Sequence, residues 1–213
     1  MFNKKRNKRD ILISLVPNGA GKILDIGCGE GSLSAGFKNS GAEVVGIEKD
    51  EQLCKDAQQK LSRVFAADAE ALKLPYPQNY FDCILCADIL EHLLEPLEFL
   101  KKIQLYLNNS GSIVASMPNI RYYKVIIRLL LGGTWDYSNK GILDKSHLRF
   151  FTLINIKELF AEAGYEILEI KRNIVASRGF RVLNFILFGC GSFRSATENR
   201  NVDSSQVVEL KWY

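Results

Sequence analysis

The chain has 213 residues, of which 47% are hydrophobic and 24% charged, and its formal net charge is +4. This length and composition suit a single domain that buries its own core, and they exclude a wholly disordered chain. The five cysteines form no even-numbered disulfide framework, and no apolar run is long enough to span a bilayer. We therefore predict a cytoplasmic protein without a transmembrane segment.

Residues 1–9 form a basic tail that contains five lysines and arginines. We interpret this tail either as a solvated terminus or as an electrostatic contact with an anionic substrate, a nucleic acid or a membrane surface. Residues 10–213 are predicted to form one domain, because no internal repeat divides them.

Short apolar segments alternate with helical patterns along this domain, which predicts an α/β fold with a largely parallel sheet. Seven segments have the character of strands: 22–26, 43–47, 64–67, 81–87, 112–116, 165–175 and 206–212. Helices are predicted at 32–39, 51–61, 153–163 and from Pro96 to about Leu107. The nearly continuous apolar run 81–87 is typical of a central strand that is buried on both faces.

Two later segments interrupt this alternation. Residues 118–150 follow the fifth predicted strand. An insertion at this point lies over the carboxyl ends of the strands, where ligands bind, so we predict a lid that binds a substrate. Trp135 and Tyr137 in this segment offer aromatic faces of the kind on which sugars stack. The apolar segment 178–195 is interpreted as core or lid packing, a homodimer face or a peripheral membrane contact.

The first predicted strand runs into a glycine loop, Gly27-Cys28-Gly29-Glu30-Gly31, which opens the first helix. Glycines allow the backbone to turn sharply and to approach a ligand closely. Glu48 closes the second predicted strand about 20 residues later, where an acid meets a bound ribose. The order of strand, loop, helix and acid therefore predicts a nucleoside-binding site.

Acidic residues around this loop indicate which nucleoside it binds. Asp25 and Glu30 disfavour a pyrophosphate and suit a cationic ligand that carries an ammonium group, which favours S-adenosylmethionine (SAM) over a dinucleotide. Asp68 follows the third predicted strand and is placed to accept a hydrogen bond from an adenine amino group.

Four segments, 23–31, 45–48, 67–70 and 81–84, resemble the successive motifs of class I SAM-dependent methyltransferases. This resemblance implies a Rossmann-like, seven-stranded, mostly parallel sheet with an antiparallel last strand and helices on both faces. It also implies that Glu48 binds the ribose, that Asp68 lies near the adenine, and that Ala87 and Asp88 lie beside the sulfonium. The expected cofactor-binding residues are Asp25, Gly27, Cys28, Gly29, Glu30, Gly31, Glu48, Lys49, Asp68, Ala69, Ala87 and Asp88.

Two further segments, 116–119 and 141–152, resemble a bacterial branch of these enzymes. Its members often accompany glycosyltransferases and genes for cell-surface polysaccharides. The resemblance therefore implies a sugar or polysaccharide precursor as the acceptor.

The chain has only two histidines, His92 and His147. An alcohol acceptor must lose its proton during methyl transfer, and an imidazole with a near-neutral pKa is suited to remove it. We therefore expect His147 to be the catalytic base, with His92 as the second candidate. His147 could instead be a structural residue bonded to a lid carbonyl.

Asp88, Glu91 and His92 share one face if a helix begins at position 88, and they then form a possible ligand set for a divalent metal ion. The segment resembles the acid-x-x-Glu-His motif of ubiquinone-pathway O-methyltransferases and small-RNA 2′-O-methyltransferases, in which the matching residues bind metal. Asp88 stands where those families usually have Glu. The alternative is that Glu91 and His92 only cap and pack the helix.

We therefore predict a SAM-dependent methyltransferase that O-methylates a small molecule or a glycan precursor. A quinone-like phenol and an RNA 2′-hydroxyl are the alternative acceptors, although a nucleic acid is the less favoured partner. Outside this class, the alternatives are a nucleotide-sugar oxidoreductase and a non-catalytic module that binds the cofactor.

Overall fold

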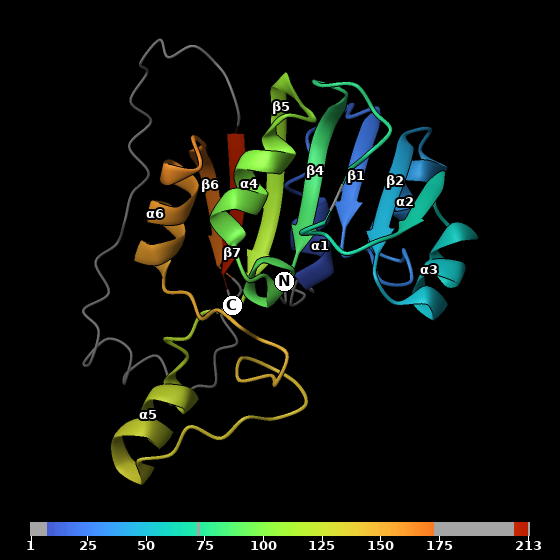
Figure 1. The fold of residues 1–213 in the computed structure, drawn as a ribbon. Coiled ribbons are helices and arrows are strands. Elements are labelled where there is room, and N and C mark those ends of the chain that lie inside the picture. The colour runs from blue at the N-terminus through green and yellow to red at the C-terminus, as the bar shows by residue number, and fades with distance from the viewer. Residues whose placement is uncertain (1–7, 72, 173–206, 213) are drawn as a thin grey trace, which may run out of the picture.

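The computed structural model describes residues 8–71, 73–172 and 207–212 as a sheet covered by helices (Figure 1). The sheet has the strand order β3-β2-β1-β4-β5-β7-β6. The strands are β1 (Lys22–Ile26), β2 (Glu43–Glu48), β3 (Arg63–Ala66), β4 (Phe81–Ala87), β5 (Leu107–Met117), β6 (Glu166–Arg172) and β7 (Val207–Trp212). This arrangement confirms the predicted Rossmann-like α/β fold with a parallel sheet.

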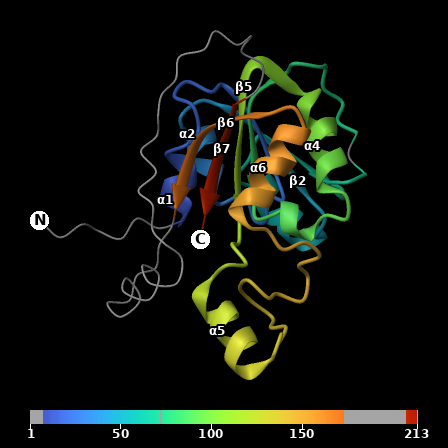
Figure 2. The same ribbon diagram turned by 90° about the vertical axis from the view of Figure 1, so that its left-hand side faces the viewer.

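Helices cover both faces of the sheet, with α1 and α2 on one side and α4 and α6 on the other (Figure 2). The helices are α1 (Lys8–Ile13), α2 (Ala35–Asn39), α3 (Glu51–Gln58), α4 (Pro96–Gln104), α5 (Tyr123–Gly132) and α6 (Leu153–Glu162), with a 3-10 turn η1 (Leu90–His92). Local signals set several boundaries. Asp50 accepts hydrogen bonds from two backbone amides at the start of α3, and Thr152 forms a capping box with Asn155 at the start of α6.

Each face of the sheet has its own hydrophobic core. On one face, Phe99 and Ile103 of α4 and Phe160 of α6 pack with Ile84 of the central strand β4. On the other face, Leu12 of α1 and Ala57 of α3 pack with alternate strand residues. Because β4 contributes to both cores, its sequence is apolar at nearly every position.

The last strand differs from the sequence prediction. Strand β7 pairs in parallel with both β5 and β6, so the expected antiparallel last strand is wrong for this structure. A hairpin needs only a tight turn, whereas a parallel return needs a crossover of about a dozen or more residues. Residues 173–206 separate β6 from β7, which is enough chain for such a crossover.

Strand β5 also begins earlier than predicted. Residues 108–111, which precede the predicted strand 112–116, are part of β5. A register shift between Phe81 and Cys83 lets β4 follow the longer partner, and the Asn108 side chain donates a hydrogen bond of 2.6 Å to Asp82.

Residues 118–150 leave the sheet after β5 and return to it before α6. Asn119 and Phe151 form a β-bridge, and the Ile120 amide donates to the Phe151 carbonyl at 3.0 Å, so the two ends of this insertion lie side by side. Helix α5 lies on the side of the sheet where β1 and β4 end (Figure 1). The predicted apolar segment 178–195 and most of the basic tail lie outside the described residues. Among the helices that the structure describes, none has the length and apolarity that a membrane span requires.

Gly46 tests how tightly β2 packs against the glycine loop. A Cβ at this position would lie 2.7 Å from the Cys28 sulfur and 2.8 Å from Leu61, so we expect Gly46→Ala to destabilise the protein by about 1–3 kcal/mol. Gly36 in α2 is the matched control, because a Cβ there meets nothing within 4 Å and alanine favours a helix. Urea unfolding of both variants checks this expectation, and equal free energies of unfolding would contradict it.

Candidate active site

The predicted cofactor residues lie at one edge of the sheet. The glycine loop follows β1, Glu48 ends β2, Asp68 follows β3, and Ala87 ends β4. Because β1 pairs in parallel with β2 and with β4, the carboxyl ends of these strands are adjacent. The strand order reverses between β1 and β4, and ligands bind at such a switch point in open α/β sheets.

The backbone of β2 anchors the glycine loop. The amides of Gly27 and Cys28 both donate to the Ile47 carbonyl, at 2.9 and 3.0 Å, and the Gly29 amide donates to the Glu48 carboxylate at 2.9 Å. Gly29 has a φ of +55°, and a Cβ there would meet nothing within 4 Å. The loop therefore leaves open space beside its backbone, as a close approach to a nucleoside requires.

Glu48 has acceptor capacity beyond its loop contacts. One carboxylate oxygen accepts from Gly29 and the other from the Asp50 amide at 3.0 Å. Each carboxylate oxygen has two lone pairs, so the group can also accept hydrogen bonds from ribose hydroxyls. Lys49 follows Glu48 directly and is exposed. Asp68, after β3, is also exposed, and its carboxylate accepts from the Glu70 amide, while Ala69 is buried. The hydrogen-bond acceptors at this edge fit the hydroxyl and amino groups of a nucleoside.

Asp25 is a buried carboxyl group, with only 1% of its surface exposed. One oxygen accepts a hydrogen bond of 2.6 Å from the Ser34 hydroxyl, and the other has no partner among the described residues. Burial raises the pKa of Asp25 to about 6; the Ser34 hydrogen bond opposes this rise and the charge of Glu48 adds to it. A cationic ligand at this edge would favour the ionised form of Asp25.

Two other loop residues are engaged by protein groups. Glu30 pairs with Lys60 at 3.0 Å and accepts from Ser32, and these contacts hold the pKa of Glu30 below its usual range. The Cys28 thiol is buried, and burial raises its pKa, so it acts as a packing group rather than as a nucleophile. Lys60 thus neutralises Glu30, one of the two acids that were predicted from the sequence to lie near the ligand.

Asp88 has a strained backbone at the end of β4. Its φ is +52°, in the left-handed region that residues other than glycine rarely adopt. Hydrogen bonds with Ser116 hold it there: the Asp88 amide donates to the Ser116 carbonyl at 2.9 Å, and the Ser116 hydroxyl donates to the Asp88 carboxylate at 2.8 Å. Lys8 at the start of α1 forms an ion pair with the same carboxylate. Sequence reasoning missed both partners, because nothing in the spacing links them to position 88.

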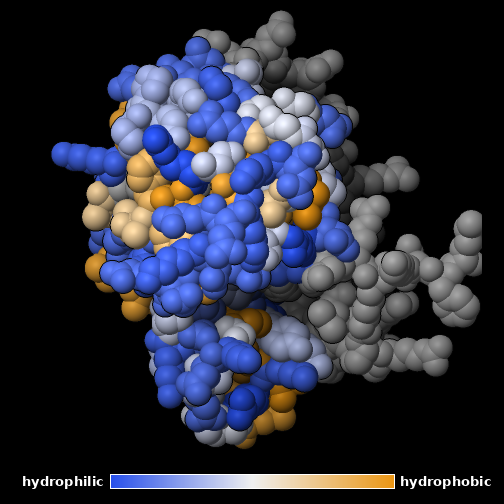
Figure 3. All heavy atoms as spheres, turned by 90° about the vertical axis from the view of Figure 1, so that its right-hand side faces the viewer, coloured by the Kyte–Doolittle hydropathy of each residue, from blue (hydrophilic) through white to orange (hydrophobic). Residues whose placement is uncertain are grey.

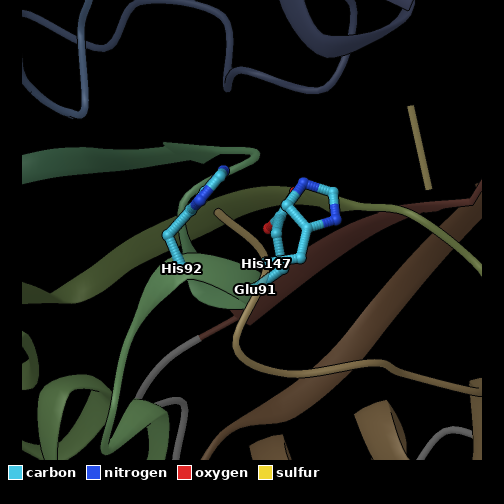
Figure 4. A group of neighbouring side chains, drawn as sticks. All are labelled: Glu91, His92 and His147. Atoms are coloured by element: carbon cyan, nitrogen blue, oxygen red, sulfur yellow. The ribbon is translucent and has the colours of Figure 1, made fainter. Parts of the chain in front are cut away.

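Glu91, His92 and His147 meet where the insertion contacts the end of β4 (Figure 4). Their ligand atoms all lie within 4.8 Å of one another, and the two imidazole rings have centroids 4.8 Å apart. The Glu91 carbonyl accepts from the amides of Leu148 and Arg149, at 2.8 and 3.0 Å, which fixes the loop that carries His147. The structure therefore brings together the two histidines that the sequence singled out.

Both histidines are held in the same tautomer. Nδ1 of His92 lies 3.0 Å from the Ser146 carbonyl, and Nδ1 of His147 lies 2.9 Å from the Ile142 carbonyl. Because a carbonyl oxygen can only accept, each Nδ1 carries a hydrogen, and each neutral ring keeps its lone pair on Nε2. A lone pair oriented in this way can take a proton or bind a metal ion.

The electrostatics of this cluster favour uncharged groups. Burial raises the pKa of Glu91 to about 8, and the neighbouring charge of Asp88 contributes to the rise. One Glu91 oxygen is buried without a partner in the part of the chain that is described. Burial also lowers the pKa of His92, so this imidazole is neutral near pH 7.

The composition of the cluster differs from the predicted metal set. Residues 88–92 do not form one α-helix: Asp88 is in the left-handed region, and only Leu90–His92 form a 3-10 turn. Asp88, Glu91 and His92 therefore do not share a helix face, and His147 takes the third place in the gathered group. The sequence spacing indicated Glu91 and His92 as metal ligands. His147 joins them only because the insertion folds back onto the end of β4.

A cavity of about 310 Å³ lies between α5 and the loop that follows it. The walls include the apolar residues Val125, Ile142 and Leu143 and the charged residues Lys124, Arg128 and Asp136. Since the Ile142 carbonyl also holds the His147 ring, the cavity wall is in direct contact with the histidine cluster. A mostly apolar cavity with a few polar groups is typical of a small-molecule site.

Comparison with known proteins identifies the family and the fold of this chain. Residues 3–170 match the profile of the methyltransferase domain family. The chain is 30% identical over 158 residues to an uncharacterized methyltransferase of Alkaliphilus oremlandii, a match that covers 72% of this chain and 71% of that protein. A SAM dependent methyltransferase from Archaeoglobus fulgidus has a similar fold, with a TM-score of 0.57 and 24% identity over 84% of this chain and 86% of that one.

Another relative bears a more specific name. A ubiquinone biosynthesis O-methyltransferase of Acinetobacter baylyi is 28% identical over 131 residues, which cover 54% of this chain and 55% of the relative. The match thus spans just over half the length of that curated relative.

The chain belongs to the methyltransferase domain family. Residues 3–170 form a methyltransferase domain of the SAM-dependent kind, for which SAM is the cofactor. The predicted enzyme class is therefore confirmed, and the alternative of a nucleotide-sugar oxidoreductase is set aside.

Asp25 gives this site a measurable pH signature. The folded-state pKa of about 6 lies above the ordinary 3.8, so ionisation opposes folding, and the wild type loses stability as pH rises from about 4 to 6. Asp25→Asn cannot ionise, and its free energy of unfolding should gain roughly 3 kcal/mol relative to wild type between pH 4 and pH 7. Urea unfolding across this range checks the difference, and a constant offset would show that Asp25 does not ionise in this window.

Proposed function

We propose that this enzyme transfers a methyl group to a hydroxyl of a small molecule or glycan precursor bound in the cavity beside α5, with His147 as the base. The contact that carries the proposal is the hydrogen bond of 2.9 Å between His147 Nδ1 and the Ile142 carbonyl in the cavity wall. It orients the Nε2 lone pair and ties the base to the acceptor cavity.

In this proposal, the edge formed by the ends of β1 to β4 holds the cofactor. Glu48 binds the ribose hydroxyls, Asp68 and Ala69 lie at the adenine, and Asp25 and Asp88 favour the cationic methionine end. SAM supplies a methyl group on a sulfonium, which is transferred by in-line displacement. The remaining proposed contacts come from Gly27, Cys28, Gly29, Glu30, Gly31, Lys49 and Ala87.

The proton of the acceptor hydroxyl passes to His147 Nε2. A neutral imidazole is required, and the Ile142 carbonyl keeps the other ring nitrogen protonated. His92 is the second candidate, because its ring is 4.8 Å from that of His147 and burial keeps it neutral near pH 7. His92 also stabilises the position of the loop through its contact with the Ser146 carbonyl.

The identity of the acceptor is proposed from the chemistry of the insertion. Apolar walls with Lys124, and with Arg128 paired to Asp136 in the same lining, suit an acceptor that has both an apolar part and an anionic group. The segments 116–119 and 141–152, which resemble the polysaccharide-associated branch, support a glycan precursor. A quinone-like phenol is the second candidate, supported by the name of the Acinetobacter baylyi relative.

A divalent metal ion at Glu91, His92 and His147 is a second mechanism that the geometry supports. One carboxylate and two imidazoles within 4.8 Å are ligands that Zn²⁺ and Mn²⁺ accept, and the buried Glu91 oxygen lacks a partner among the described residues. Such an ion would lower the pKa of a bound hydroxyl. His147 would then be a ligand instead of the base, so the two mechanisms exclude each other at Nε2.

His147→Ala tests the base. We expect kcat to fall by about 10²–10⁴, because general base catalysis contributes that much. Affinity for S-adenosylhomocysteine, measured by calorimetry, should remain unchanged, because His147 is not among the proposed cofactor contacts. Release of S-adenosylhomocysteine with a panel of nucleotide sugars and catechols checks turnover. Near-normal turnover in the variant would contradict both the base and the metal role of His147.

Metal removal distinguishes the two mechanisms. If His147 is the base, protein treated with EDTA and then freed of chelator should keep its full activity, and calorimetry should detect no stoichiometric binding of Mn²⁺ or Zn²⁺. One tightly bound ion that is lost in Glu91→Gln, with activity that follows occupancy, would replace the base mechanism by the metal mechanism. Glu95→Gln is the matched control, because Glu95 is exposed and outside the cluster.

A further inference from the structure

Helix α5 ends in an exposed apolar surface, the leucine end, which consists of Leu129, Leu130 and Leu131. Leu130 and Leu131 are 76% and 85% exposed, respectively. The first turns of the helix behave differently, since Val125 is buried. The exposed leucines therefore belong to the outer part of the insertion, which α5 carries away from the sheet (Figure 1).

Other apolar side chains of the insertion are also exposed. Trp135, Tyr137 and Leu148 keep a third to a half of their surface accessible, with Trp135 packed against Phe150 at a ring distance of 5.3 Å. Single exposed leucines are common, but three in sequence at a helix end, in a segment that also exposes Trp135 and Tyr137, indicate a surface that contacts another molecule. In Figure 3, the lower lobe formed by the insertion shows hydrophobic surface beside hydrophilic surface.

The insertion that carries this apolar surface is also rich in basic residues. Residues 118–150 contain six basic and two acidic residues, a net charge of +4, which equals the net charge of the whole chain. All six basic side chains are exposed, and Asp136 faces Arg128 at 3.5 Å. The basic residues are Arg121, Lys124, Arg128, Lys140, Lys145 and Arg149.

Helix α5 places basic and apolar side chains on adjoining faces. Lys124 and Arg128 are four residues apart and share one face of α5, while Leu130 and Leu131 follow Ile127 by three and four residues on the adjoining face. Long basic side chains beside an apolar helix face can keep their charges in the headgroup region while the apolar side chains enter the acyl boundary. Tryptophan and tyrosine are enriched at the same depth.

Charge decides between a membrane and a second copy of this chain. A symmetric dimer through the leucine end would place the same basic residues of both copies close together, and like charges repel. An anionic bilayer offers hydrocarbon to the leucines and negative charge to the basic residues. We therefore propose that the insertion docks on the surface of membranes that contain anionic phospholipids, with the leucine end inserted at the interface.

Docking does not depend on the acceptor proposed above. Lys124 and Arg128 line the cavity as well as the basic surface, so the bound enzyme would hold its acceptor cavity at the bilayer surface. This position suits an acceptor that is itself anchored in the membrane.

Vesicle flotation with the full-length chain tests the proposal. We expect binding to vesicles of phosphatidylcholine mixed with phosphatidylglycerol and little binding to phosphatidylcholine alone. Leu130→Glu/Leu131→Glu should lower the partition coefficient by about tenfold or more, because two carboxylates replace two inserted side chains. Leu105→Glu/Leu168→Glu is the matched control, since both leucines are more than half exposed and lie outside the insertion.

A second variant tests the charge. Lys124→Gln/Lys140→Gln leaves the leucines in place and should also weaken binding by about tenfold, with a weaker dependence on salt. Calorimetry with S-adenosylhomocysteine in solution should give wild-type affinity for every variant, so that loss of docking is distinguished from loss of the cofactor site.

Four outcomes would overturn the proposal. The leucine variant could bind like wild type, which would assign binding to other residues such as the basic tail 1–9. Wild type could bind neutral vesicles equally well. The leucine variant, but not the control variant, could unfold at a lower midpoint and still bind vesicles like wild type. This result would mean that the leucines pack against another part of their own chain. Sedimentation could show a dimer that the variant dissociates, without vesicle binding, which would identify a second copy as the partner.

Discussion

Strand β1 lies between β2 and β4 and pairs in parallel with both. These two pairings bring the glycine loop, Glu48 and Ala87 to the same edge of the sheet. The loop is then held by backbone groups, since Gly27 and Cys28 donate to the Ile47 carbonyl and Gly29 donates to Glu48. The proposed cofactor edge thus depends on main-chain register and on backbone hydrogen bonds.

The same edge concentrates acidic groups in a partly buried place. Burial raises the pKa of Asp25 and of Glu91, and the Asp88 carboxylate contacts Lys8 and Ser116 in a strained backbone conformation. Ionised carboxylates in such surroundings oppose folding, and a cationic ligand would relieve that cost. The site is therefore less stable without a ligand than its packing alone would allow, a common property of functional sites.

The insertion is attached to this edge through a few specific contacts. The Glu91 carbonyl holds the loop at Leu148 and Arg149, and the Asn119–Phe151 bridge closes its base. Between these attachments, the loop carries His147 to the end of β4, and α5 extends outward with its basic residues and the leucine end. One segment can thus supply a base or metal ligand, an acceptor cavity and a docking surface, because its two ends are fixed while its outer part faces solvent.

The sequence by itself determined the edge of the sheet at which the cofactor is proposed to bind. The apolar pattern located the strands, and the loop, Glu48 and Asp68 follow their strands directly, so parallel pairing alone brings them together. Only the tertiary structure decided the acceptor half. His147 is far in sequence from Glu91 and His92, and no periodicity relates an irregular loop to a strand end. The expected helix face of Asp88, Glu91 and His92 failed because Asp88 adopts a left-handed conformation, and the antiparallel last strand failed because local patterns do not encode strand direction.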